Sequence, residues 1–194
     1  MSDPRRPAPA AILRKLDRTL RTRHLVRVHR TIPDADTIDG FVLGTNPEWT
    51  LLAECPEVRL DGFTAIRTPD IARIRKHGDE DSLTIRALRR RGQWPPPPSP
   101  VTFDDLPGLL TSAARHHTLL TVHLEHEAPD IAWIGTVARL TRKTLRLHQI
   151  DPDARWHPRP TKFPLAAITQ VAFGSHYEHT LEEFADAPAP TARH

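Results

Sequence analysis

Basic side chains are the residues of this chain whose type and spacing could do chemistry, and the chemistry they suggest is phosphate binding. Residues 1–31 contain nine Arg or Lys against two Asp. Such a basic segment can bind a phosphate backbone, and a solvated helix face is the alternative interpretation. The candidates in this segment and in a later arginine cluster are Arg14, Lys15, Arg18, Arg21, Arg89, Arg90 and Arg91.

Histidines suggest a second chemistry, metal binding. The densest group of the twelve lies at residues 116–127. On a strand at about 118–126, His123 and Glu125 share one face while His126 points to the other, so only part of the group converges. The His123-x-Glu125 pair is similar to the H-x-E of zinc deaminases, but Cys55 is the single cysteine and those enzymes need two. We predict no metal and no cofactor, with His123 and Glu125 as weak candidates.

Motifs of common enzymes are missing. The sequence has no G-x-S-x-G, no P-loop and no G-x-G-x-x-G, and its eight glycines leave little material for loops that hold phosphates. A single cysteine excludes an internal disulfide. The sequence therefore predicts a protein that is not an enzyme.

Composition is consistent with a soluble protein. Hydrophobic residues make up 38% of the 194, there are 20 prolines, and the net charge is +3. No apolar run approaches the 18 residues of a membrane helix, and the Pro-rich N-terminus lacks the apolar region of a signal peptide. We expect a cytoplasmic protein that does not enter the membrane.

An internal repeat is visible when the sequence is shifted on itself by about 95 positions. The matching residues are similar in character rather than identical, as in a diverged duplication. They include Ile12 with Leu106, Val28 with Val122, Gly40 with Gly135, Leu52 with Leu147, and Ile71 with Ile168.

Each repeat is expected to contain a helix followed by five short strands. In the first, apolar spacing predicts a helix over 9–22 and strands near 24–31, 40–43, 49–54, 63–67 and 71–74. In the second, Thr102 or Asp104 is expected to cap the helix, and strands follow near 118–126, 131–140, 143–150, 163–165 and 168–173. The boundaries are a disordered 1–8, a first unit 9–75, a helix and Pro-rich linker 76–101, a second unit 102–185 and a disordered tail 186–194. The expected core is Val28, Val42, Leu52, Ile66, Ile71, Val122, Val137, Leu147, Phe163 and Ile168.

This order of elements, with a glycine in the second strand of each repeat, resembles the Sm-like fold, a small SH3-like barrel. The stretch from Trp49 through Ile71 also resembles a segment of uncharacterised bacterial proteins in which a DGF/Y…R..DI run closes such a barrel. The segment from Ile168 to Tyr177 is similar to barrel-closing segments of the same kind of protein, and neither segment brings an established activity. The resemblance implies a mainly β, α+β fold of two tandem five-stranded barrels. In Sm-like RNA binders, the loop after the second strand holds a nucleotide, which implies candidates at Asn46, Arg142 and Lys143. Glu48 in that loop, and a tandem that would not easily close a ring, depart from the family pattern.

The sequence therefore predicts a non-catalytic binding or adaptor protein built from two small β-barrels, with a partner that is a protein or a nucleic acid and is not identified by the sequence. RNA or single-stranded DNA binding through the basic residues is the alternative, and a small metal-dependent hydrolase is a second alternative. The oligomeric state stays open.

Overall fold

The protein is mainly antiparallel β-sheet with flanking helices, as the sequence predicted. The computed structural model describes residues 9–187. Within this range, neighbouring strands pair in the antiparallel direction in both halves of the chain. The chain divides into two compact units, Met1–Asp61 with Ala65–Ser99 and Gly62–Thr64 with Pro100–His194. Among the described residues, no helix is long and apolar enough to cross a membrane.

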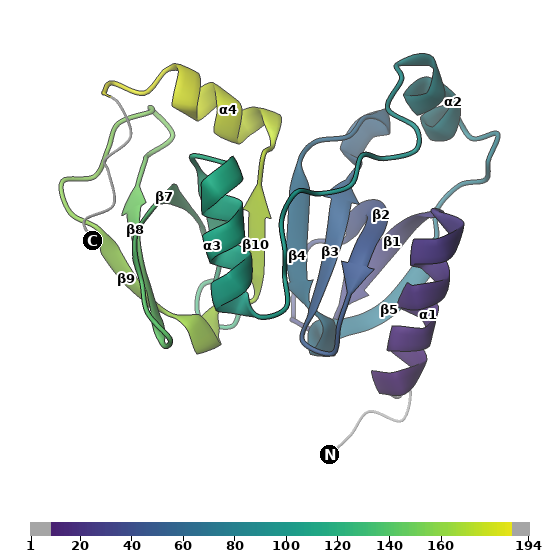
Figure 1. Cartoon of the computed structure of the whole chain (residues 1–194), viewed down its shortest axis with the longest axis horizontal. Helices are drawn as coiled ribbons and strands as arrows, with labels where there is room; N and C mark the ends of the chain where they lie inside the picture. Colours follow the sequence, from purple (N-terminus) through teal and green to yellow (C-terminus); the bar gives the residue numbers. More distant parts are fainter. Residues whose placement is uncertain (1–8, 188–194) are drawn as a thin grey trace. The chain divides into compact units, whose positions relative to one another are not determined.

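Unit 1 is a curled sheet with two helices (Figure 1). Its elements are α1 (Pro9–Thr22), β1 (Leu25–Arg30), β2 (Ile38–Thr45), β3 (Trp49–Glu54), β4 (Phe63–Arg67), β5 (Ile71–Lys76) and α2 (Leu83–Arg90), with 3₁₀ turns η1 (Pro56–Val58) and η2 (Thr68–Asp70). The strand order is β5-β1-β2-β3-β4. The end strands β4 and β5 would lie about 19 Å apart in a flat sheet, yet the three residues of η2 join them, so the sheet must curl. Since β4 and β5 are not hydrogen-bonded neighbours, the sheet stays open and a closed barrel is not confirmed.

The two helices of unit 1 cover opposite faces of this sheet. Ile12 and Leu16 of α1 pack in one cluster with Val26 and Val42. The neighbouring residues in those strands, Leu25 and Phe41, pack instead with Ile85 and Leu88 of α2. Because successive side chains in a strand point to opposite faces, α1 closes the inner face and α2 the outer one.

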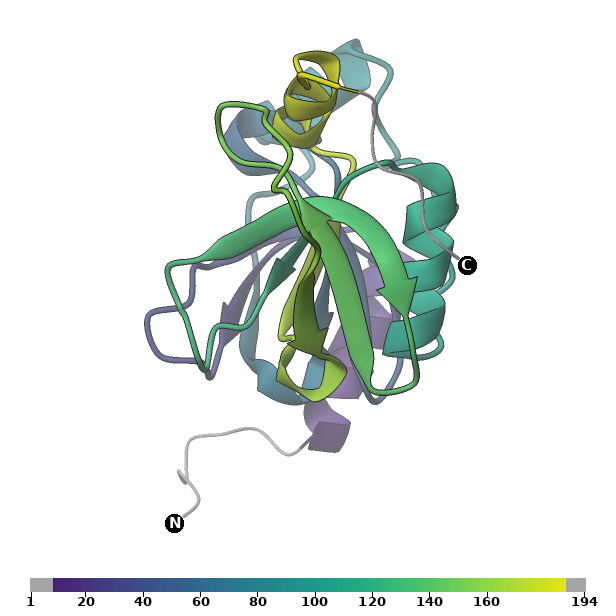
Figure 2. The same cartoon turned by 90° about the vertical axis from the view of Figure 1, so that its left-hand side faces the viewer.

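Unit 2 repeats this plan (Figure 2). Its elements are α3 (Leu106–His116), β6 (Leu120–His123), β7 (Ala132–Leu140), β8 (Thr144–Gln149), β9 (Thr161–Pro164), η3 (Leu165–Ala167), β10 (Gln170–Phe173) and α4 (His176–Glu183). The order β10-β6-β7-β8-β9 corresponds strand by strand to that of unit 1. Ser175 begins α4 with a capping box, in which its hydroxyl accepts from the Glu178 N–H and the Glu178 carboxylate accepts from the Ser175 N–H.

The strand registers confirm the predicted repeat. Val26 lies opposite Gly40, and Leu120 opposite Gly135. The pairing of β2 with β3 shifts between Val42 and Gly44, and that of β7 with β8 shifts between Val137 and Arg139, which are the aligned positions.

The two aligned glycines are needed because a backbone approaches closely. A Cβ on Gly40 would lie 2.5 Å from the carbonyl oxygen of Ala53, and a Cβ on Gly135 would collide with the carbonyl oxygen of His148, the residue aligned with Ala53. Glycine at this position lets the strand bend over its neighbour.

Two local predictions were wrong, the cap of α3 and the burial of Val137. Asp105, rather than Thr102 or Asp104, caps α3 by accepting a 2.7 Å hydrogen bond from the Gly108 N–H. The predicted core residues are buried except Val137, which is half-buried where the register shifts. The segments predicted to be disordered, 1–8 and most of 186–194, lie outside the described residues.

Candidate functional site

Helix α1 carries its basic side chains beside its buried stripe. Ile12 and Leu16 are four residues apart, so they lie on the same side of the helix, and both are buried in the core. Arg14, Lys15 and Arg18 are exposed on the neighbouring part of the helix surface. The sequence therefore builds a helix that is anchored by apolar residues and cationic along its flank.

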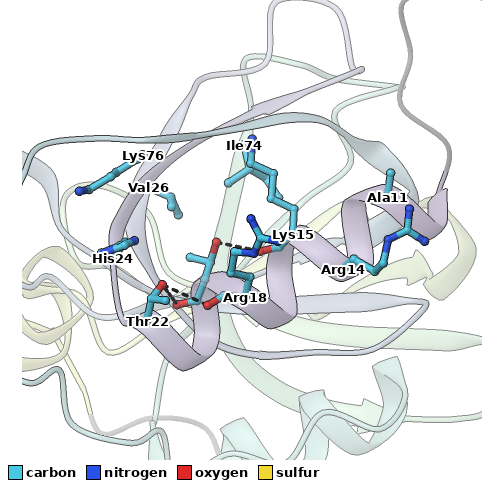
Figure 3. Close-up of a pocket in the computed structure, with 10 residues that line it drawn as sticks. Ala11, Arg14, Lys15, Arg18, Thr22, His24, Val26, Ile74 and Lys76 are labelled. Atoms are coloured by element: carbon cyan, nitrogen blue, oxygen red, sulfur yellow. Dashed lines mark hydrogen bonds between the residues drawn. The ribbon is translucent and has the colours of Figure 1, made fainter.

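This flank forms one wall of a cavity of about 510 Å³ within unit 1 (Figure 3). The other wall comes from β1, β5 and the residue before β1. The lining residues are Ala11, Arg14, Lys15, Arg18, Thr19, Thr22, His24, Val26, Ile74 and Lys76. We call this cavity the basic groove.

Among residues 9–187, no carboxylate lines the basic groove. Within residues 9–187, we find no ion pair or hydrogen bond to the side chains of Arg14, Lys15 or Arg18. Lys76 differs, because its Nζ lies 2.8 Å from Oδ1 of Asp79. The hydrogen bond from Lys76 lowers the pKa of Asp79, with smaller contributions from the charges of Lys76 and His24. Three cations are thus available for an anionic ligand, and a fourth is shared with Asp79.

The two hydroxyl groups of the groove, those of Thr19 and Thr22, are occupied within α1. The Thr19 hydroxyl donates to the Lys15 carbonyl at 2.9 Å, and the Thr22 hydroxyl donates to the Arg18 carbonyl at 3.0 Å. No aromatic side chain of the described residues lines the groove, so this part of the chain offers no platform there on which a base could stack. Its chemistry is therefore charge attraction toward an anion.

The second basic cluster lies elsewhere in unit 1. None of Arg89, Arg90 and Arg91 lines the groove, because α2 covers the other face of the sheet. Arg91 donates from Nη1 to the Val58 carbonyl at 2.8 Å, and Arg89 donates to the Glu80 carbonyl at 3.4 Å. Arg21 is exposed on α1 but also lies outside the groove lining.

The loops implied by the family resemblance are equivalent turns in the two units. The Asn46 Oδ1 accepts from the backbone N–H groups of Glu48 at 2.8 Å and Trp49 at 2.7 Å. The aligned Thr141 hydroxyl accepts from those of Lys143 at 3.3 Å and Thr144 at 3.0 Å. The Asn46 oxygen therefore holds its turn, as Asx chemistry does. Arg142 and Lys143 are exposed in unit 2 and belong to the second turn.

The weak metal candidates, His123 and Glu125, lie among residues that contribute to the fold. Glu125 is buried and its Oε2 accepts a 2.7 Å hydrogen bond from the Thr169 hydroxyl. His123 is the last residue of β6 and is half-buried. Across the described range, no group of three or more His, Cys, Asp or Glu side chains is arranged to hold a metal ion.

Sequence reasoning missed His24, the residue before β1, and Lys76, the last residue of β5, which both line the groove opposite α1. The sequence contained one signal for Lys76, because Ile74 and Lys76 alternate with Arg73 and Arg75 and must therefore share one face of the strand. It did not reveal that the inner face of β5 would meet α1.

Comparisons with known proteins add little to this site. No protein-family model matches the chain, and no curated protein matches it. A solved structure that is similar is the crystal structure of YcgR in complex with c-di-GMP from Escherichia coli, at 10% identity, with 92% of this chain and 89% of that chain covered. The TM-score is 0.21, and a likeness at this level carries no argument about fold or function.

Proposed function

We propose that this protein is a non-catalytic binding protein that binds RNA or single-stranded DNA through the basic groove of unit 1. The proposal keeps the binding role expected from the sequence and favours its nucleic-acid alternative over a protein partner. It also retains the Sm-like interpretation of the two curled sheets, which their matching strand orders support.

One observation carries the proposal: three exposed cations of α1 line one cavity, and no acid within the described residues pairs with them. Cations held together over a concave surface raise the local concentration of a phosphate backbone. Each cation that contacts a phosphate releases condensed counterions, which makes binding favourable and salt-dependent.

The test is the affinity of a fluorescent single-stranded oligonucleotide, measured by anisotropy. The native protein is compared with the triple variant Arg14→Ala, Lys15→Ala, Arg18→Ala. Loss of three phosphate contacts should weaken binding by about 100-fold at about 0.1 M salt. The three side chains are exposed, so the far-ultraviolet circular dichroism should not change.

The matched control removes the same charge elsewhere, with Arg115→Ala, Arg146→Ala and Arg159→Ala, three exposed residues of unit 2. If the control weakens binding as much as the groove variant, only net charge matters and the groove is not the site.

A protein partner remains a second candidate function because of one feature of unit 2. Tyr177 and Phe184 lie seven residues apart at α4, on the same side of the helix, and are 49% and 68% exposed. Large exposed aromatic residues are typical of protein interfaces. Changing both to Ser should abolish capture of a specific protein from a lysate if this adaptor function is correct, and should leave oligonucleotide binding unchanged.

A further inference from the structure

Strand β5 carries cations on both of its faces. Ile74 and Lys76 line the basic groove on the inner face. Arg73 and Arg75 alternate with them and therefore point to the outer face. Since β5 is the end strand of the order, a single strand separates the groove from this outer surface.

The outer surface is built by the pairing of β5 with β1 and of β1 with β2. Arg73 lies opposite His29, and Arg75 lies opposite Arg27. On the other side, Arg27 lies opposite Asp39 and holds it with two hydrogen bonds, from Nε to Oδ1 at 2.7 Å and from Nη2 to Oδ2 at 2.6 Å. The acid of this surface is thus already paired with Arg27.

Arg73 and Arg75 are exposed, and no ion pair to either is found among the described residues. The ring of His29 lies beside these arginines, opposite Arg73 in the strand pairing. Burial lowers the pKa of His29, and the charges of Arg73, Arg75 and Arg27 lower it further, against a smaller opposite effect of Asp39. Its Nε2 is buried and has no hydrogen-bond partner among residues 9–187.

We propose that Arg73 and Arg75 form a second phosphate-binding surface that continues the basic groove around the edge of β5, and that the ligand is a single-stranded polynucleotide long enough to bend over this strand. The proposal rests on the function proposed for the groove. Arg75 and Lys76 are consecutive and exposed, and they belong to opposite faces of β5. A flexible polynucleotide whose phosphates contact both residues would therefore pass from one surface to the other. A mononucleotide or a very short oligonucleotide would occupy the groove alone.

The experiment compares two lengths of oligothymidylate, about 5 and about 15 nucleotides, within the range of known single-strand sites. The protein variant is Arg73→Ala with Arg75→Ala. Its affinity for the short oligonucleotide should equal that of the native protein. For the long one, two lost phosphate contacts should reduce the salt slope by about 1.4 and weaken binding about 25-fold at about 0.1 M salt.

The matched control is Arg59→Ala with Arg86→Ala, two exposed arginines of unit 1 that neither line the groove nor belong to the paired strands β5 and β1. If the variant and the control bind the long oligonucleotide alike, the outer surface is not used and the inference fails, while the groove function stands. Equal weakening for both lengths also overturns it, because the site would then be one compact surface. Equally tight binding of polyglutamate would overturn it in favour of an acidic protein ligand. If the native protein binds neither oligonucleotide, the function proposed for the groove fails first.

Discussion

Neutralising Asp79 should make this protein bind nucleic acid more tightly. Asp79 lies outside the lining of the groove but holds the ammonium group of Lys76 at 2.8 Å. The substitution Asp79→Asn removes the charge that competes with a phosphate for Lys76. A gain in affinity is informative because damage to the fold does not produce one.

The expected gain in affinity corresponds to one additional cation, Lys76, that becomes free to contact a phosphate. One further phosphate contact adds about 0.7 to the salt slope for a single strand, which corresponds to about fivefold tighter binding at about 0.1 M salt. The side chains of Lys76 and Asp79 are 46% and 86% exposed, so their pair contributes little to folding and the melting temperature should hold.

The assay is anisotropy of a short labelled oligonucleotide over a series of salt concentrations. Asp81→Asn is the matched control, since it makes the same change of charge two residues away without touching Lys76. The reasoning is refuted if Asp79→Asn and Asp81→Asn tighten binding equally, because the gain would then come from net charge.

Other predictions concern the framework around the site. Gly135→Ala should lower the free energy of unfolding by about 2 kcal/mol in urea titrations, because its Cβ would collide with the His148 carbonyl; unchanged stability would contradict the close approach. Burial raises the pKa of Cys55 to about 11, so its thiol should react slowly with a disulfide reagent at about pH 8 and quickly after unfolding. Burial also raises the pKa of Glu178 above its ordinary value of 4.5, against the hydrogen bond from Thr121. The folded state therefore holds this proton at a higher pH than the unfolded state, so stability should increase as pH falls toward 4.5, and Glu178→Gln should lack this increase.

Much of the fold could be predicted because apolar residues alternate along the strands in both repeats. Apolar alternation placed Val28, Leu52 and Ile71 in the core, and the shared glycines marked the strand that bends over its neighbour. The open sheet could not be foreseen, since hydrogen bonding between β4 and β5 depends on backbone geometry at η2. The choice of Asp105 as the cap of α3 was missed because Thr102, Asp104 and Asp105 are all residue types that can cap a helix.

About half of the candidate site could be predicted from the sequence. Arg14, Lys15 and Arg18 were identified because they flank an apolar stripe at helical spacing. The joining of α1 to β5 is a tertiary contact without a local signal, so Lys76 was missed. Arg89, Arg90 and Arg91 were assigned to the same function by charge alone, whereas α2 packs through Ile85 and Leu88 on the opposite face.

The dependence of affinity on salt tests the central claim most directly, since it counts the phosphates that the groove contacts. For a short oligonucleotide, three unpaired cations predict a slope of log K against log salt of about −2 in the native protein. The triple variant Arg14→Ala, Lys15→Ala, Arg18→Ala should bring that slope close to zero. A slope that is the same in the native protein and the triple variant would contradict the assignment of the basic groove as the nucleic-acid site.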